Sequence, residues 1–164
     1  MNYAQIRKYD VANGPGIRTT IFVTGCTHNC KECFNKEYQD FNFGDPWTDK
    51  ETEMVKDYLN QPEVAGLTVL GGEPFQNTEG LVPLLKAIRK STDKDIWIFS
   101  GDTFETIKAD AKKFELLKLC DVLVDGPFVN EWKDLRLKFR GSSNQRIIKI
   151  KDSIEEDKVV LWEE

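Results

Sequence analysis

The sequence lacks any apolar stretch long enough to cross a lipid bilayer, and residues 1–7 lack the apolar core of a signal peptide. It also lacks internal repeats, low-complexity tracts and linker-like segments. A chain of 164 residues without such breaks is long enough to bury a real core, so we expect one domain, residues 1–164. We therefore expect no membrane association and a location in the cytoplasm.

Basic residues are fewer than acidic residues in this chain. The chain has 23 Lys and Arg residues against 28 Asp and Glu residues, a formal net charge of −5. Because affinity for nucleic acids comes largely from Lys and Arg that neutralise phosphates, a broad nucleic-acid surface is not expected. Proteins or small molecules are the favoured partners.

Cysteine is also scarce, but three of the four cysteines, Cys26, Cys30 and Cys33, fall within eight residues. Thiols are kept reduced in the cytoplasm, so this cluster favours a metal site over a disulfide framework. A cluster of four irons normally takes one thiolate per iron. Three thiolates leave one iron open to bind and activate another molecule, which indicates a catalyst.

A structural zinc site is the alternative, with His28 or Cys120 as the fourth ligand. It is less favoured because zinc motifs usually bring their ligands as two separated pairs. Cys120 precedes an expected strand, where a small buried apolar side chain is the simpler interpretation.

Short apolar runs alternate with longer segments of helical periodicity, which predicts an α/β fold with mostly parallel strands. Strands are expected at residues 17–24, 67–70, 96–99 and 121–124, with late strands at 145–150 and 158–162. Helices are expected from Thr48, where Glu51 completes a capping box, around residues 81–88, and over residues 104–117 after Thr103 as N-cap. So few units predict a shortened, incomplete (β/α) barrel.

The expected strands end in chemically suggestive residues. The cysteine loop follows the first strand, Gly71-Gly72-Glu73 the second, Ser100 the third, and Asp125 the fourth. Parallel β/α folds place their active sites at such carboxyl ends. Two glycines allow a ligand to approach the backbone closely, and Glu73 suits a cationic ligand group, although a plain turn explains the bare pattern equally well.

Two further motifs have simple structural interpretations. Residues 14–18, Gly-Pro-Gly-Ile-Arg, read as a rigid turn that ends in a surface arginine. Residues 141–146 form a polar run that reads most simply as a solvated loop.

The cysteine spacing followed by residues 71–74, Gly-Gly-Glu-Pro, resembles the radical S-adenosylmethionine superfamily. Residues 13–18 resemble the activases of glycyl radical enzymes within it. Residues 124–126 and 140–145, with the small size, are similar to the activating enzymes of anaerobic (class III) ribonucleoside-triphosphate reductase. The resemblance extends from Met1 to about residue 146.

The resemblance implies a [4Fe-4S] cluster on Cys26, Cys30 and Cys33, with S-adenosylmethionine chelating the fourth iron through its amino and carboxylate groups. Reductive cleavage would give methionine and a 5′-deoxyadenosyl radical, which takes a hydrogen atom from a glycine on the large subunit of the reductase. Reduced flavodoxin is the electron donor that the resemblance implies.

The resemblance also implies a set of residues that contact S-adenosylmethionine: Glu32, Cys33, Phe34, Gly71, Gly72, Glu73, Ser100 and Asp125. Two positions depart from the family pattern. Glu32 stands where many members carry an aromatic residue against the adenine, so the backbone there or Phe34 must make that contact. Pro127 stands where other activases carry a lysine, so other groups must hold the carboxylate of the ligand.

Two other functions remain open. One is activation of a different glycyl radical enzyme, of the formate-lyase type, although such activases are typically longer and often carry extra ferredoxin-like cysteines. The other is a zinc-binding module without chemistry. The short chain and residues 140–145 favour the reductase.

Overall fold

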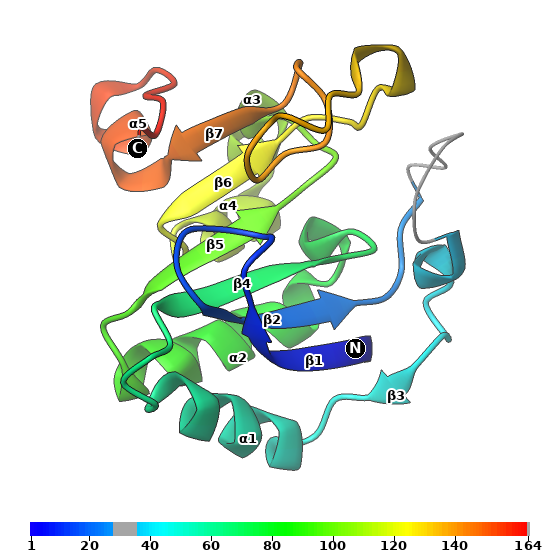
Figure 1. The fold of residues 1–164 in the computed structure, drawn as a ribbon, viewed down its shortest axis with the longest axis vertical. Coiled ribbons are helices and arrows are strands. Elements are labelled where there is room, and N and C mark those ends of the chain that lie inside the picture. Colours follow the sequence, from blue (N-terminus) through cyan, green and yellow to red (C-terminus); the bar gives the residue numbers. More distant parts are fainter. Residues whose placement is uncertain (28–35, 164) are drawn as a thin grey trace.

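The computed structural model describes residues 1–27 and 36–163, and in these ranges the strands form one seven-stranded sheet (Figure 1). The strands lie in the order β3-β1-β2-β4-β5-β6-β7. Their bounds are β1 Asn2–Asp10, β2 Arg18–Val23, β3 Asp45–Pro46, β4 Gly66–Gly71, β5 Asp95–Phe99, β6 Val122–Asp125 and β7 Arg146–Lys149. β2, β4, β5 and β6 run parallel, and β1, β3 and β7 are antiparallel to their neighbours.

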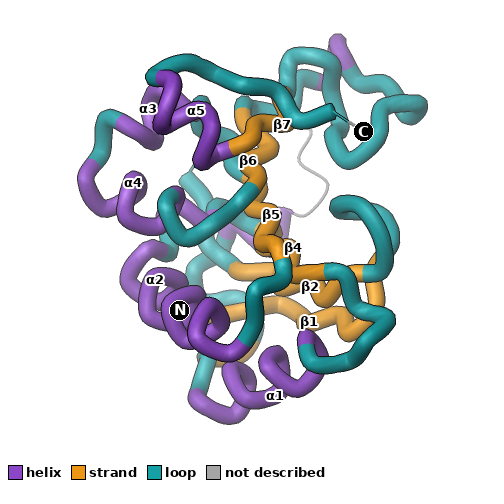
Figure 2. Tube along the Cα trace, turned by 90° about the vertical axis from the view of Figure 1, so that its left-hand side faces the viewer, coloured by secondary structure: helices purple, strands orange, loops and turns teal. Residues whose placement is uncertain are grey.

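The α-helices gather on one face of this sheet (Figure 2). They are α1 Asp49–Leu59, α2 Thr78–Ser91, α3 Phe104–Lys108, α4 Ala111–Leu117 and α5 Ile150–Glu156, with short 3-10 turns at η1 Lys36–Gln39, η2 Pro74–Gln76 and η3 Asn130–Trp132. Alternate strand residues such as Ile21, Val69 and Ile98 are fully buried against them. This packed layer is the main core and holds the parallel strands in place.

A smaller apolar cluster covers the opposite face. Trp97 of β5 is fully buried there and packs edge-on against Phe139 and Trp162, with ring centroids 5.6 Å and 5.1 Å apart. Val122 and Val124 complete the cluster. Phe139 and Trp162 lie in loop segments, so loops rather than helices cover this face of the sheet at β5 and β6.

The four strands expected in the middle of the sheet are confirmed, as are the capping box of α1 and the N-cap of α3. The carboxylate of Glu51 accepts hydrogen bonds from the backbone and the hydroxyl of Thr48. The hydroxyl of Thr103 accepts from Thr106 N at 3.3 Å. Among the described helices, none combines the length and apolar character that a membrane span requires.

Three expectations about the elements were wrong. Residues 104–117 form two helices, because Asp110 caps a new one by accepting from Lys112 N and Lys113 N. Residues 158–162 make only an isolated bridge, between Ile148 and Leu161. Residue 150 opens α5 instead of ending a strand.

Arg18 is not a surface residue. Its side chain is only 1% exposed, and it donates to Thr68 Oγ1 at 2.8 Å and Leu67 O at 2.9 Å. Gly14 has φ +138°, and a Cβ there would lie 2.7 Å from Arg18 Cδ. The glycine turn before β2 therefore makes room for a buried arginine.

Candidate functional site at the carboxyl edge of the parallel strands

The parallel strands bring four chain segments together at one edge. Val23 of β2 pairs with Gly71 of β4, and Phe99 of β5 pairs with Val124 of β6. The segments that follow these strands therefore start side by side. Cys26, Glu73, Ser100 and Asp125 all belong to this carboxyl edge, as the sequence predicted.

The backbone around Cys26 is held from two sides. Gly25 N donates to Tyr38 O at 2.7 Å, and Cys26 N donates to Gln39 O at 3.0 Å. On the other side, Glu73 N donates to Gly25 O at 2.8 Å. The side chain of Cys26 is half-buried. Its position is thus fixed by hydrogen bonds from both neighbouring segments.

The paired glycines after β4 are required by the backbone of β2. Gly71 has φ +119°, and a Cβ on it would lie 2.2 Å from Val23 O. A Cβ on Gly72 would lie 2.6 Å from Gly25 O. Gly72 N also donates to Val23 O at 2.8 Å. The glycines let the segment after β4 lie directly against the segment that leads to Cys26. Their contact with a ligand stays a prediction.

Glu73 is buried, with 1% of its surface exposed, and its carboxylate joins two strand ends. Oε1 accepts from Gly101 N at 2.7 Å, and Oε2 accepts from Ser100 Oγ at 2.9 Å and from Phe75 N at 3.0 Å. A buried carboxylate needs such donors to offset its desolvation. Glu73 is therefore held in one orientation before any ligand arrives, and it caps η2.

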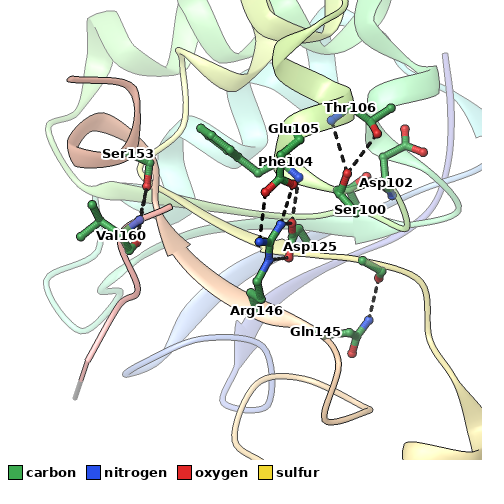
Figure 3. Close-up of polar contacts among 12 residues, drawn as sticks. Ser100, Asp102, Phe104, Glu105, Thr106, Asp125, Gln145, Arg146, Ser153 and Val160 are labelled. Atoms are coloured by element: carbon green, nitrogen blue, oxygen red, sulfur yellow. Dashed lines mark hydrogen bonds and ion pairs between the residues drawn. The ribbon is translucent and has the colours of Figure 1, made fainter. Parts of the chain in front are cut away.

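Asp125 is equally buried, at 1% exposed, and its carboxylate is tied to Arg146 (Figure 3). Arg146 Nε donates to Oδ1 at 3.0 Å and Nη2 to Oδ2 at 2.6 Å, while Phe104 N donates to Oδ2 at 2.8 Å. Arg146 also donates to both carboxylate oxygens of Glu105, at 3.1 Å and 2.8 Å. One guanidinium thus links β6, β7 and α3.

The charges in this network stabilise one another. Hydrogen bonds to Asp125, and then to Glu105, raise the pKa of Arg146. The hydrogen bond from Arg146 lowers the pKa of Glu105. In this arrangement Arg146 has little donor capacity left for a ligand carboxylate. Sequence reasoning missed its role, because the pattern gave only a polar run.

Residues 141–146 are not the solvated loop that the sequence suggested. Residues 141–145 end a longer segment, residues 127–145, which we call the strap. Gln145 Oε1 accepts from Gly141 N at 2.8 Å, and Gln145 Nε2 donates to Gly126 O at 3.1 Å. Ser142 is fully buried, and its hydroxyl accepts from Val129 N at 3.2 Å. Polar side chains of the strap therefore bond to its own backbone and to the end of β6.

Several predicted site residues lie outside the described part of the chain: His28, Cys30, Glu32, Cys33 and Phe34. Their placement stays a prediction. Cys120 is described and is 4% exposed, with its Sγ 3.6 Å from Leu116 O. Burial raises the pKa of its thiol. It precedes β6, at the edge opposite Cys26, which confirms its interpretation as a small buried side chain.

Cys26 fits the donor chemistry of an iron–sulfur cluster. Its thiol lies on a backbone fixed by its neighbours, at the start of the loop that carries the other two cysteines. Soft thiolate sulfur is the ligand that such clusters take. The described residues thus place Cys26 at the carboxyl edge that also carries Glu73, Ser100 and Asp125, and its role as a cluster ligand stays a prediction.

Comparison with known proteins identifies the class. The family described as "4Fe-4S single cluster domain" matches residues 12–148 of this chain. The match therefore covers β2 to β6, the carboxyl edge and the strap, and leaves out β1.

Curated relatives are more specific. The anaerobic ribonucleoside-triphosphate reductase-activating protein of Pasteurella multocida is 39% identical over 152 residues, 90% of this chain and 96% of that protein. The protein of the same name from Escherichia coli K12 is 39% identical over 150 residues, 88% of this chain and 96% of that protein. The one from Enterobacteria phage T4 is 37% identical over 150 residues, 90% of this chain and 93% of that protein. The chain belongs to this family of anaerobic ribonucleoside-triphosphate reductase-activating proteins.

Proposed function

We propose that this protein is the activating enzyme of an anaerobic ribonucleoside-triphosphate reductase. It cleaves S-adenosylmethionine reductively at a [4Fe-4S] cluster and generates a glycyl radical on the large subunit of the reductase. The observation that supports this most directly is the position of Cys26 beside Glu73, in a chain related to the activating proteins over nearly their whole length.

Cys26, Cys30 and Cys33 would hold the cluster. When bound, it supplies one electron to the sulfonium of S-adenosylmethionine, and the bond to the 5′-carbon breaks to give methionine and a 5′-deoxyadenosyl radical. A hydrogen atom then passes from a glycine α-carbon of the partner to that 5′-carbon. Reduced flavodoxin is the proposed electron donor, and the cytoplasm the proposed location.

The chain itself has to position S-adenosylmethionine. Its proposed contacts are Glu32, Cys33, Phe34, Gly71, Gly72, Glu73, Ser100 and Asp125. Glu73 and Asp125 already accept hydrogen bonds at both carboxylate oxygens, so they enter the reaction with fixed orientation and satisfied charge. In this proposal they shape and polarise the site and move no proton.

The sheet has to keep water and stray C–H groups away from a primary carbon radical. We assign the fold to the shortened (β/α) barrel of the radical S-adenosylmethionine type and residues 1–164 to a single domain. Phe22 and Phe99 lie on the face without helices, at the strand ends near the cysteine loop. The strap adds cover beyond β6, where Phe139 packs against Trp97.

Electron paramagnetic resonance tests the proposal. The anaerobically reconstituted and reduced protein is mixed with S-adenosylmethionine and the large reductase subunit, and a glycyl radical signal is expected on the reductase. Omission of S-adenosylmethionine is the control. Cleavage of S-adenosylmethionine without any radical on the reductase would refute the assigned target, and zinc in place of iron and sulfide would refute the enzyme.

A further inference from the structure

The strap exposes apolar side chains that the fold does not use. Leu135 is 89% exposed, the highest value among the large apolar side chains of the described chain, and Trp132 is 53% exposed. Single exposed apolar residues are common on protein surfaces. Here a tryptophan and a leucine are both exposed within four positions of one loop, and their exposure does nothing for solubility.

The turn that carries Leu135 is built by its neighbours. Asp134 O accepts from Leu137 N at 3.2 Å, and Asp134 Oδ1 accepts from Arg136 N at 2.9 Å. Tips of such turns usually carry polar residues or glycine. The hydrogen bonds that form the turn do not involve the Leu135 side chain, so its apolar character does not serve the turn.

Trp132 is held by its backbone and not by its ring. Its amide donates to Val129 O at 3.0 Å, and its carbonyl accepts from Ser143 N at 2.9 Å. The ring is thus carried on a fixed support while more than half of the side chain faces solvent. Rigid, partly exposed aromatic side chains are typical anchors of protein interfaces.

The charge of the strap is opposite to that of the chain. Four basic residues, Lys133, Arg136, Lys138 and Arg140, stand against Glu131 and Asp134, in a protein with net charge −5. The side chain of Arg136 is 91% exposed and pairs with Asp134 at 3.0 Å. A basic, partly apolar surface complements an acidic partner surface.

The strap also lies where a partner has to approach. It leaves β6 after Asp125 and returns to β7 at Arg146, so both of its ends start from the carboxyl edge (Figure 1). The hydrogen bonds of Gln145 and Asn144 to Gly126 and Pro127 fix these two ends together. A protein bound to the strap is therefore held beside the edge that carries Cys26.

We infer that the strap is the docking surface for the large reductase subunit, with Trp132 and Leu135 as apolar anchors and its basic residues against an acidic surface next to the partner's glycine. This inference rests on the proposed function and adds the surface that delivers the substrate. Its occupant is a folded, acidic region of the reductase.

Binding measurements test the inference. The reconstituted protein is titrated with the large reductase subunit at low and high salt, as wild type, as the double variant Trp132→Ser and Leu135→Ser, and as Arg136→Glu. The matched controls are Val11→Ser, an apolar side chain 72% exposed before β2, and Lys112→Glu on α4. Thermal unfolding and iron content check that each variant is intact.

The double variant is expected to raise Kd at least about tenfold, since anchors of this kind dominate interface energies. Arg136→Glu is expected to raise Kd several-fold at low salt and less at high salt, because salt screens exposed charge. The controls are expected to stay within about twofold of wild type, the range of surface substitutions outside an interface.

Unchanged reductase affinity in the double variant would overturn the docking inference alone, while radical formation by the wild type keeps the proposed function. A change of oligomeric state in sedimentation, with reductase affinity unchanged, would also overturn it, because the occupant would then be a second copy. A wild-type protein that neither binds nor activates the reductase would overturn the proposed function and this inference together.

Discussion

The two edges of the parallel strands both bury charge, but the charge has opposite sign. At the amino edge, Arg18 is 1% exposed and bonds to Thr68, to Leu67 O and to Asp95. At the carboxyl edge, Glu73 and Asp125 are each 1% exposed and accept from backbone N–H groups. Burial of a charged group therefore does not by itself mark a functional site in this fold.

The edges differ in what lies next to the buried charge. Within the described part of the chain, Arg18 contacts strands and the turn before β2, and these contacts include Trp97 of β5, whose ring centroid is 5.7 Å away. The carboxylates of the other edge lie beside glycine backbones, Ser100 and the chain that leads to Cys26. The amino edge thus contributes to stability, and the carboxyl edge combines buried charge with close-packed glycines and a cysteine.

The largest expected effect distinguishes Cys26 at the carboxyl edge from Cys120 at the amino edge. Cys26→Ser is expected to abolish cluster binding and glycyl radical formation, because oxygen is a poor substitute for thiolate on iron. Cys120→Ala, at the amino edge, is the matched control. It is expected to retain the cluster and to lose only a modest amount of stability. Iron and sulfide analysis and the absorption spectrum near 400 nm measure both.

A Cys26→Ser variant with a full complement of iron and full activity would remove the carboxyl edge as the cluster site. Loss of iron in Cys120→Ala, in a variant that remains folded, would contradict the separation of the edges.

The second effect concerns the amino edge alone. Arg18→Met is expected to lower the free energy of unfolding by about 2–4 kcal/mol, because it leaves buried acceptors such as Leu67 O and Thr68 Oγ1 without their donor. Asp95 is 42% exposed and can turn to solvent, so the buried acceptors account for most of this effect. Chemical denaturation measures it.

The control for this variant is Arg89→Met, which removes a donor to Asp121, Leu119 O and Lys94 O and should cost less, because these hydrogen bonds are only partly buried. A stability loss in Arg18→Met no larger than in Arg89→Met would contradict the structural role of the amino edge.

The central strands and the edge residues were predictable from sequence because their signals are local. Buried parallel strands appear in a sequence as continuous apolar runs, and the residues that follow each run identify the carboxyl edge. β1 gave no such signal. Its sequence is largely polar, it pairs with β2 along one side, and β3 covers only its first residues. An edge strand with half-exposed side chains does not produce an apolar run.

The burial of Arg18 and the link from Arg146 to Asp125 were not predictable, because they depend on contacts between distant segments. Arg18 meets residues 49 to 77 positions away, and Arg146 meets residues 21 and 41 positions away. A sequence shows an arginine at each place and no partner. Interpretation as a surface or loop residue follows from local context alone.

The third effect tests whether Glu73 serves the ligand or only the fold. Glu73→Ala is expected to keep the cluster and to lower S-adenosylmethionine affinity at least about tenfold. It should also destabilise the protein by about 1–3 kcal/mol, because Gly101 N and Phe75 N lose a buried acceptor. Glu73→Gln removes the charge but keeps one acceptor oxygen, for either Gly101 N or Phe75 N, while its NH2 group faces the other donor. Calorimetry of S-adenosylmethionine binding and denaturation of the same samples separate the two roles.

If Glu73→Gln binds S-adenosylmethionine as tightly as the wild type, the carboxylate charge is structural, and the backbone of Gly71 and Gly72 carries the contact.

The smallest effect concerns the exposed end of the Arg146 network. The pKa of Glu105 is lowered in the folded protein by its hydrogen bond to Arg146. A lowered folded-state pKa means that this carboxylate stabilises the fold above its unfolded pKa, near 4.3, and that the stabilisation is lost as pH falls through the folded pKa. Glu105→Gln should therefore reduce stability at pH 7 and have less effect in acid. Since the Glu105 side chain is 60% exposed, the difference is expected to be only about 0.5 kcal/mol.

Urea denaturation between pH 7 and acid measures this difference, with Glu115→Gln as the control for an exposed pair outside the carboxyl edge. An equal loss at pH 7 and in acid would show that Glu105 acts through packing and not through its charge.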